Sequence, residues 1–334
     1  MKVALVRPPV TGHGARGIGF YGQRLYEALS KITNVSWRDF SYLPITGFDI
    51  VHYPYFDLFW PTLPPIRFSK TVVTLHDLTP LKFPEHFPLG IRAKVVWPWQ
   101  KFLLKQVDAV LTDSYCSKKD IEEMTGVRNV FVTYLAADKV FRPLNFKREN
   151  FVLYVGGGNW NKNVITLIKA CQKINMPLVI VGKEFAMPIK KNVETEPLRE
   201  ILSLVHTRSR TTNLIKFAGF VETSELVKLY NQAKVYVQPS VYEGFGLPVL
   251  EAMACNTPVI CGGNSSLAEI AGNAATFADV LDVNDLADKI KNIKDSGSPL
   301  GLPRVARMTQ AAKFSWEKTA KETYEIYKKI LKRD

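Results

Sequence analysis

The sequence predicts an α/β protein in which helices cover both faces of parallel sheets. Short runs rich in β-branched residues alternate with amphipathic stretches along the chain, which is the pattern of repeated strand–helix units. The chain has 334 residues, of which 46% are hydrophobic and 22% charged, as in an ordinary globular protein. This length favours two domains, each large enough to bury its own core.

The predicted strands fall into two series, separated by residues 141–150 (FRPLNFKREN), a polar segment without periodicity. The first series comprises residues 3–6, 50–53, 72–75, 109–112 and 131–133, and the second comprises residues 152–155, 177–181, 215–218, 235–237, 259–261 and 274–277. We therefore predict a first domain over residues 1–143 and a second over 144–313. Residues 314–334 form a terminal amphipathic helix, because their apolar residues recur at helical spacing.

The formal net charge is +13, and the basic excess is divided almost evenly between the two predicted domains. This spread argues against a nucleic-acid-binding arm, although an anionic partner fits the charge. The four cysteines are scattered and lack zinc-ligand spacing, so we expect reduced thiols in a cytoplasmic protein. The apolar start MKVALV ends at Arg7 and two prolines, which favours a strand over a signal peptide. No apolar run approaches the length needed to cross a bilayer.

A glycine-rich stretch, TGHGARGIGF, precedes the first amphipathic segment. Gly12, Gly14 and Gly17 fit the spacing of a dinucleotide-binding loop, so a nicotinamide cofactor is one alternative. Such a loop follows its strand directly, whereas residues 7–11 with two prolines intervene here. The simpler prediction is that Gly17 and Gly19 open a helix whose first N–H groups face a phosphate.

The predicted strand at residues 72–75 leads directly into His76 and Asp77. Open α/β sheets bind their ligands at the carboxyl ends of the strands. His76 is therefore a catalytic candidate, and a purely structural histidine is the alternative.

Basic and aromatic side chains are interleaved between residues 67 and 105, where seven basic residues accompany two acidic ones. One interpretation is a solvated helix whose aromatic face packs on the core. The alternative is a surface that contacts anionic lipid head groups, or a lipid-linked acceptor, at the inner face of the membrane.

The second domain opens with a strand, the three glycines Gly156, Gly157 and Gly158, and then Lys162 before an amphipathic helix. Backbone N–H groups of glycines and a nearby lysine are typical of a phosphate-binding loop. The Walker pattern is absent, so this is not a P-loop. A solvated lysine beside a tight turn is the alternative.

Residues 237–262 (VQPSVYEGFGLPVLEAMACNTPVICG) combine a buried strand, a glycine-bearing loop, a helix and a second strand. The carboxylates Glu243 and Glu251 bracket the loop. Proline favours the first helical position, so we predict that the helix opens at Pro248 and that Glu251 lies within its first turn. The glycines let backbone N–H groups approach a ligand closely. An ordinary connection with a capping acid is the alternative.

Taken together and in this order, these segments resemble the retaining GT-B glycosyltransferases of family 4. The resemblance is carried by GIGFYGQRLYEAL, VVTLHDLTPLKFPEHFP, DAVLTDSYCSKKDI, YVGGGNWNKN, FAGFVETSELVKLYNQA and the stretch with Glu243 and Glu251. It extends over nearly the whole chain, up to FSWEKTA in the terminal helix. It implies two Rossmann-like domains that face a cleft, with the terminal helix crossing back to the first domain.

The resemblance also implies roles for single residues. Glu251 would bind the ribose hydroxyls and Glu243 would face the donor sugar. Lys162 would neutralise the diphosphate, and His76 would sit against the sugar. The implied catalytic set is His76, Glu243 and Lys162, and the implied donor-binding set is Gly17, Gly19, Gly157, Lys162, Gly244, Phe245, Gly246, Leu247 and Glu251.

The implied reaction is transfer of a hexosyl unit from a UDP- or GDP-linked sugar to a hydroxyl of a saccharide or lipid-linked saccharide, with retention of anomeric configuration. Charge builds up on the leaving diphosphate, and fixed cations and N–H dipoles stabilise it. No two aspartates stand two positions apart, so we expect neither a metal nor a cofactor besides the donor. A nucleotide-sugar-binding module without transfer activity is the alternative from another class.

Overall fold

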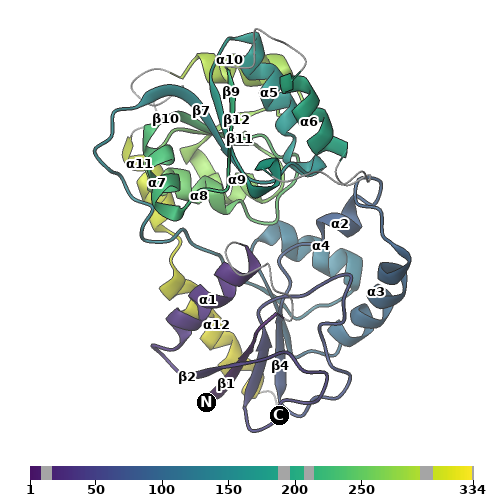
Figure 1. Cartoon of the computed structure of the whole chain (residues 1–334). Helices are drawn as coiled ribbons and strands as arrows, with labels where there is room; N and C mark the ends of the chain where they lie inside the picture. Colours follow the sequence, from purple (N-terminus) through teal and green to yellow (C-terminus); the bar gives the residue numbers. More distant parts are fainter. Residues whose placement is uncertain (9–16, 187–195, 207–213, 294–303, 333–334) are drawn as a thin grey trace. The chain divides into compact units, whose positions relative to one another are not determined.

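The computed structural model of the chain describes residues 1–8, 17–186, 196–206, 214–293 and 304–332. It contains two compact units, each built on a six-stranded parallel sheet (Figure 1). Unit 1 comprises Met1–Pro84, Leu89–Ala136 and Phe314–Asp334, and unit 2 comprises Glu85–Pro88 and Ala137–Lys313. The predicted α/β class with two parallel sheets is confirmed. Gly12 and Gly14 lie outside the described residues.

Unit 1 has the strand order β2-β1-β3-β4-β5-β6. Its strands are β1 (Lys2–Val6), β2 (Asn34–Arg38), β3 (Ile50–Tyr53), β4 (Lys70–Thr74), β5 (Ala109–Thr112) and β6 (Val130–Val132). Its helices are α1 (Ile18–Leu29), α2 (Thr79–Lys82), α3 (Ile91–Leu104), α4 (Tyr115–Thr125) and α12 (Trp316–Leu331). The inner strands are almost wholly buried, because helices cover both faces of a parallel sheet.

The last helix, α12, packs against α1 within unit 1. The ring of Trp316 meets the ring of Phe20 edge-on, with centroids 5.9 Å apart. Farther along α12, the Tyr327 hydroxyl lies 2.6 Å from Nδ1 of His52 on β3. Both Trp316 and Tyr327 are buried, so α12 completes the core of unit 1 although unit 2 separates it from α1 in the sequence.

Unit 2 has the strand order β12-β11-β10-β7-β8-β9. Its strands are β7 (Glu149–Val155), β8 (Leu178–Val181), β9 (Ile215–Gly219), β10 (Ala233–Gln238), β11 (Val259–Gly262) and β12 (Thr276–Ala278). Its α-helices are α5 (Val164–Lys173), α6 (Glu196–His206), α7 (Thr223–Gln232), α8 (Leu247–Ala254), α9 (Ser266–Ala271), α10 (Val283–Lys291) and α11 (Arg304–Ala312). Three 3₁₀ helices are η1 (Trp160–Lys162), η2 (Lys183–Ala186) and η4 (Gly272–Ala274).

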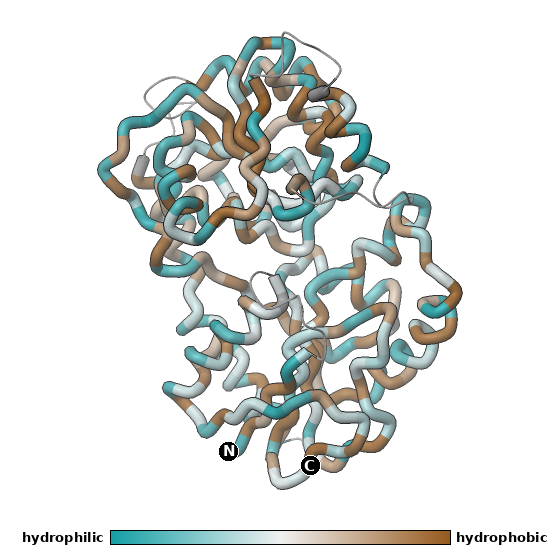
Figure 2. The backbone as a smooth tube through the Cα atoms, viewed as in Figure 1, coloured by the Kyte–Doolittle hydropathy of each residue, from teal (hydrophilic) through white to brown (hydrophobic). Residues whose placement is uncertain are grey.

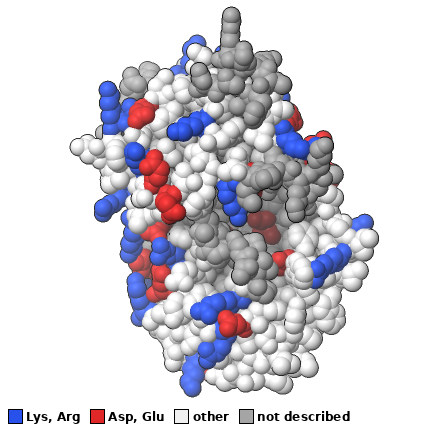
Figure 3. Space-filling model, in the orientation of Figure 1, with Lys and Arg blue, Asp and Glu red and all other residues white. Residues whose placement is uncertain are grey.

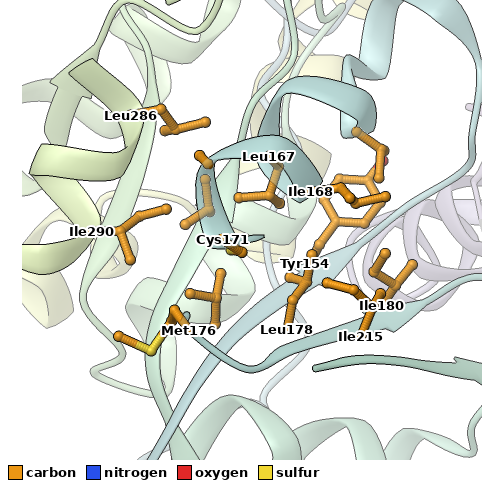
Figure 4. Close-up of a cluster of buried hydrophobic side chains, with 14 of the residues drawn as sticks. Tyr154, Leu167, Ile168, Cys171, Met176, Leu178, Ile180, Ile215, Leu286 and Ile290 are labelled. Atoms are coloured by element: carbon orange, nitrogen blue, oxygen red, sulfur yellow. The ribbon is translucent and has the colours of Figure 1, made fainter. Parts of the chain in front are cut away.

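The core of unit 2 lies on both faces of its sheet. On one face, side chains of α5 and α10 such as Leu167 and Leu286 belong to the same buried cluster as strand residues such as Ile180 (Figure 4). On the other face, Tyr230 of α7 and Val249 of α8 are completely buried. These layers fix the loops at the carboxyl ends of β7 and β10, which carry the predicted donor-binding residues.

All predicted strands overlap observed ones, but β2 was not predicted. Its residues are half-exposed at the edge of the sheet, so its sequence (NVSWR) lacks an apolar run. The predicted start of α8 was also wrong. The helix begins at Leu247, with Pro248 at its second position, because Gly246 already provides the turn into it at a φ of 101°. Glu251 therefore lies in the second turn and not in the first.

None of the four cysteines, all of which lie among the described residues, forms a disulfide, and three of them are buried. Burial raises the pKa of the Cys255 and Cys261 thiols to about 12, which keeps them protonated and unreactive. Among the described helices, none is both long and apolar enough to cross a membrane.

Candidate active site

The centre of the candidate site in unit 2 is an ion pair between Lys162 and Glu243. Lys162 ends η1, directly after the glycine-bearing loop that follows β7, and Glu243 lies in the loop between β10 and α8. The Lys162 Nζ is 2.8 Å from Oε1 and 2.7 Å from Oε2 of Glu243. The neighbouring strands β7 and β10 bring these two residues together from 81 positions apart in the sequence.

The Glu243 carboxylate is also held by neutral donors at the end of β10 and in the loop that follows it. Gln238 Nε2 donates to its Oε1 over 2.9 Å, and Ser240 Oγ donates to the same oxygen over 2.7 Å. Tyr236 in turn donates its hydroxyl hydrogen to the Gln238 side chain. The cation and the two hydrogen-bond donors hold this largely buried carboxylate in one orientation.

The loop that follows Glu243 is fixed by tight packing at Gly246 and Ser266. A Cβ on Gly246 would lie 2.5 Å from Leu267 Cδ2, and its φ is positive, so only glycine fits there. Ser266 Oγ lies 2.8 Å from the carbonyl oxygen of Glu243 and 2.9 Å from that of Phe245. The loop thus leads rigidly into α8, whose first N–H groups favour an anion.

Glu251 lies one turn into α8 and is oriented from the neighbouring helix α7. The Tyr230 hydroxyl donates to Glu251 Oε2 over 2.9 Å. Burial, followed by the Glu251 charge, raises the pKa of Tyr230 well above its usual value, so the hydroxyl remains a donor. The half-exposed Glu251 carboxylate is suited to accept hydrogen bonds from a pair of hydroxyls.

In the glycine loop after β7, one backbone N–H group donates a hydrogen bond to a carboxylate of the protein. The Gly158 N–H donates to Glu184 Oε2 over 2.9 Å, and Glu184 belongs to η2 at the end of the adjacent strand β8. A Cβ on Gly157 would lie 2.9 Å from the same oxygen, so the loop backbone and the carboxylate are in close contact. The loop therefore binds an anionic group of the protein itself.

In unit 1, His76 and Asp113 follow the neighbouring strands β4 and β5. His76 Nδ1 is 2.6 Å from Asp113 Oδ2. Burial lowers the pKa of His76, but the charge and hydrogen bond of Asp113 outweigh it, and the pKa is raised overall from its ordinary value of 6.5. Asp113 thus orients the ring and favours its protonated form.

A second buried histidine, His52, lies behind His76. Its Nδ1 contacts the Tyr327 hydroxyl of α12, and its Nε2 lies 2.8 Å from Thr74 Oγ1. Tyr21 of α1 bonds to the same Thr74 oxygen over 3.0 Å and meets the His76 ring edge-on at 4.9 Å. Burial and then the His76 charge lower the pKa of His52 to about 3, so this ring is neutral.

The predicted glycines of unit 1 adjoin this arrangement. Gly17 caps α1 with a φ of 73°, and its carbonyl oxygen accepts the Tyr21 N–H over 3.0 Å. Gly19 lies in the first turn of α1, the helix that presents Tyr21 to His76. Among the described residues, no group of three or more His, Cys, Asp or Glu side chains could hold a metal ion.

Models of known protein families match the residues of both units. The model of the family "Glycosyl transferases group 1" matches residues 137–314, which is just over half of the chain. The chain belongs to this family. The model "Glycosyltransferase Family 4" matches residues 7–139, so the two matches divide the chain close to the division between the units.

Relatives of this group 1 glycosyltransferase include bacterial mannosyltransferases. The O-antigen chain mannosyltransferase B of Escherichia coli is 29% identical over 287 residues, covering 79% of this chain and 71% of that protein. The serotype-specific mannosyltransferase WbdA of Escherichia coli is 26% identical over 277 residues, which cover 78% of this chain. The chain spans only about a third of the length of WbdA (34%).

Solved structures support the GT-B fold of this glycosyltransferase. Sucrose-phosphate synthase from Thermosynechococcus elongatus superposes with a TM-score of 0.79 at 19% identity, covering all of both chains. Anabaena Alr3699/HepE, solved in complex with UDP and glucose, has a TM-score of 0.72 at 16% identity and covers 97% of this chain and 98% of its own. At these identities the likeness shows the fold alone.

Within the glycosyltransferase, several predicted site residues contact partners that were not predicted. The structure brings Lys162 and Glu243 together and places Glu251 beside Tyr230, whereas His76 and Gly17 belong to unit 1. The partners that were not predicted are Asp113, Glu184, Tyr230, Gln238 and Ser240. The position of Asp113 after the next strand along the chain was a usable signal. The family match favours glycosyl transfer over the nicotinamide alternative.

Proposed function

We propose that this group 1 glycosyltransferase transfers a hexosyl unit from a UDP- or GDP-linked sugar to a hydroxyl acceptor with retention of configuration. The observation that carries the proposal is the Lys162–Glu243 pair beside a glycine loop and a helix start. A lysine, loop N–H groups and the N-terminus of α8 supply positive charge where a diphosphate must be bound and later released. The mannosyltransferase relatives make mannose the first sugar to test.

In the proposed donor complex, Lys162 binds the diphosphate and stays close to Glu243. Its side chain is 25% exposed, whereas that of Glu243 is 10% exposed, so the lysine is the partner that a ligand reaches more easily. Glu243 keeps Gln238 and Ser240 as donors when Lys162 shares its hydrogen bonds with phosphate oxygens. Its second oxygen, Oε2, then accepts a hydroxyl hydrogen of the donor sugar.

Glu251 is the proposed ligand of the ribose. Its carboxylate accepts hydrogen bonds from the two ribose hydroxyls, while Tyr230 holds Oε2 from behind. Gly157 and the backbone N–H groups of Gly244, Phe245, Gly246 and Leu247 complete the proposed binding set. His76, with its ring fixed by Asp113, is the proposed hydrogen-bond donor to the sugar.

The chemical step then follows from charge. The bond between the anomeric carbon and the diphosphate oxygen breaks, and Lys162 stabilises the negative charge that this oxygen gains. The acceptor oxygen attacks from the same face, and its proton moves to the leaving phosphate. We propose that the reaction needs neither a metal nor another cofactor, because Lys162 and backbone dipoles fill the charge-neutralising role.

We also propose that the acceptor is a saccharide or a lipid-linked saccharide, and that the protein works in the cytoplasm with a peripheral contact to the inner face of the membrane. The free cysteines support the compartment, because buried thiols persist in a reducing environment.

A panel of UDP-, GDP- and ADP-sugars tests the proposal through donor-dependent thermal stabilisation and release of nucleoside diphosphate with a saccharide acceptor. We expect turnover with at least one donor, in the presence of EDTA, and NMR of the product should show the anomeric configuration of the donor. Stabilisation without release on any acceptor would instead indicate a binding module. An inverted product would contradict retention, and loss of turnover with EDTA would contradict metal independence.

A further inference from the structure

Helix α3 in unit 1 has an unusual distribution of apolar residues. Its sequence, IRAKVVWPWQKFLL, contains no acidic residue and is apolar around most of its circumference. Ala93, Leu103 and Leu104 are buried against the rest of unit 1. A helix that is apolar on all sides is normally buried on all sides, yet one face of α3 is open to solvent.

The open face carries an apolar stripe, which we call the α3 stripe. Its members are Ile91, Val95, Pro98, Trp99 and Phe102, which recur at intervals of three or four residues and so share one side of the helix. Ile91 is 85% exposed, Val95 70% and Phe102 56%. The rings of Trp99 and Phe102 lie together, with centroids 6.2 Å apart. Side chains of this kind at the surface mark a contact with another apolar phase or molecule.

Basic residues flank the α3 stripe. Arg92, Lys94 and Lys105 are exposed, and by helical spacing Arg92 lies along one edge of the stripe and Lys94 and Lys105 along the other. The Arg92 guanidinium stacks on Trp60, 3.0 Å from the ring centroid, which adds another half-exposed aromatic ring to the surface. Hydrophobic (brown) and hydrophilic (teal) turns alternate along α3 in Figure 2. In Figure 3 the flank of unit 1 that carries α3 is mainly white (uncharged) and blue (Lys and Arg).

We propose that the α3 stripe docks unit 1 onto an anionic lipid bilayer. A helix of 14 residues is ~21 Å long, too short to span a bilayer, so it lies in the plane of the interface. In that orientation the apolar residues enter the acyl boundary, and the flanking cations remain at the level of the lipid phosphates. Trp99 and Trp60 belong to the residue type that is enriched at this depth.

The charges decide between a bilayer and a second copy of this chain. In a two-fold contact between two α3 stripes, each copy would place the same three cations against those of its partner. Like charges at such an interface repel, whereas an anionic lipid surface attracts every one of them. This inference rests on the surface of unit 1 alone and does not depend on the transfer activity.

Co-sedimentation of the full-length protein with vesicles tests the proposal. We expect binding to vesicles of phosphatidylcholine with roughly 30% phosphatidylglycerol, weak binding to pure phosphatidylcholine, and weaker binding as the salt concentration rises. Replacing Trp99→Ser and Phe102→Ser together should lower the partition coefficient at least about 10-fold. Neutralising Lys94→Gln and Lys105→Gln should lower it about 5-fold for each charge.

Matched controls keep the result specific. Leu281→Ser with Val305→Ser removes apolar residues of similar exposure from unit 2, and Lys31→Gln with Lys119→Gln removes exposed charges elsewhere in unit 1. Both control variants should bind as the wild type does, and all variants should melt at similar temperatures. The proposal is wrong if the wild type ignores anionic vesicles, or if the stripe and control variants bind alike. It is also wrong if the stripe variant binds vesicles as the wild type does but no longer self-associates in analytical ultracentrifugation.

Discussion

Unit 1 and unit 2 each place a cation–carboxylate pair at the carboxyl ends of parallel strands. The two pairs differ in their solvent exposure and in the other hydrogen bonds of the carboxylate. Lys162 pairs with Glu243 in unit 2, and the lysine is 25% exposed. His76 pairs with Asp113 in unit 1; the histidine is 18% exposed, and the carboxylates of Glu243 and Asp113 are 10% and 4% exposed. The Glu243 carboxylate has further donors in Gln238 and Ser240, whereas the Asp113 carboxylate contacts His76 through its Oδ2.

This difference indicates different tasks. The lysine of an accessible pair can share its hydrogen bonds with a ligand because its carboxylate keeps other donors. A buried pair loses much free energy if either member loses the other, so it fixes the position and protonation of a ring. We therefore expect ligand exchange at the pair of unit 2 and rigid positioning at the pair of unit 1.

The largest effect is expected for Lys162→Gln. If this lysine neutralises the leaving diphosphate, kcat should fall about 10²–10³-fold, measured as release of nucleoside diphosphate. The melting temperature should change little, because Glu243 keeps two other donors. Lys169→Gln is the matched control, since Lys169 is an exposed lysine that pairs with Glu200 at 4.0 Å. A variant with wild-type turnover would end the assignment of Lys162 to the diphosphate.

The His76–Asp113 pair should make the stability of the protein depend on pH, and the variant Asp113→Asn tests this. The pKa of His76 is raised in the folded protein, so its stabilising contribution is complete below about pH 6.5 and is lost as the pH rises through the folded pKa. The difference in the free energy of unfolding between the wild type and the variant should therefore decrease between pH 6 and pH 9, by at most about 1.4 kcal/mol per pH unit. Chemical denaturation at several pH values measures it. A constant difference would show that Asp113 does not raise the pKa of His76.

A smaller effect is expected for Glu184→Gln. The Glu184 carboxylate accepts the Gly158 N–H that a phosphate would use, so removing its charge should strengthen donor binding. We expect the donor Kd to fall about 3- to 10-fold, with kcat unchanged. Glu200→Gln, at an exposed site on α6, is the control. Weaker binding in Glu184→Gln would mean that the carboxylate contacts the donor and does not compete with it.

The smallest effect is expected for Tyr230→Phe, which removes one hydrogen bond from Glu251. Loss of a single bond to a charged acceptor that water can still reach should weaken donor binding about 3- to 10-fold. Tyr26→Phe in unit 1 is a comparable change away from Glu251 and should have no effect on titration calorimetry of the donor. An unchanged Kd for Tyr230→Phe would contradict the proposal that Glu251 binds the ribose.

The parts of the fold that follow from local pattern were predictable. Buried parallel strands are short apolar runs, so residues 50–53 and 109–112 were predicted with the correct ends. The edge strand β2 has no such run and was missed. The start of α8 was misplaced by one residue because proline is compatible with the first and the second helical position alike.

The contacts of the site depend on strand order, which a sequence does not show directly. Lys162 and Glu243 were both identified, but their pairing follows from the adjacency of β7 and β10. Glu184 was overlooked because it reaches Gly158 from the neighbouring strand β8. Local motifs reveal which residues carry chemistry, and the sheet decides which of them meet.

The bond between His52 and Tyr327 joins residues 275 positions apart, and it sets an order of events during synthesis. At a translation rate of 5–20 residues per second, roughly 15–55 s separate the emergence of these two residues from the ribosome. The first-made part of unit 1 lacks α12 throughout this interval, while all of the chain that unit 2 needs is made before α12. Unit 1, whose N-terminal part is translated first, is therefore the unit whose core is completed last.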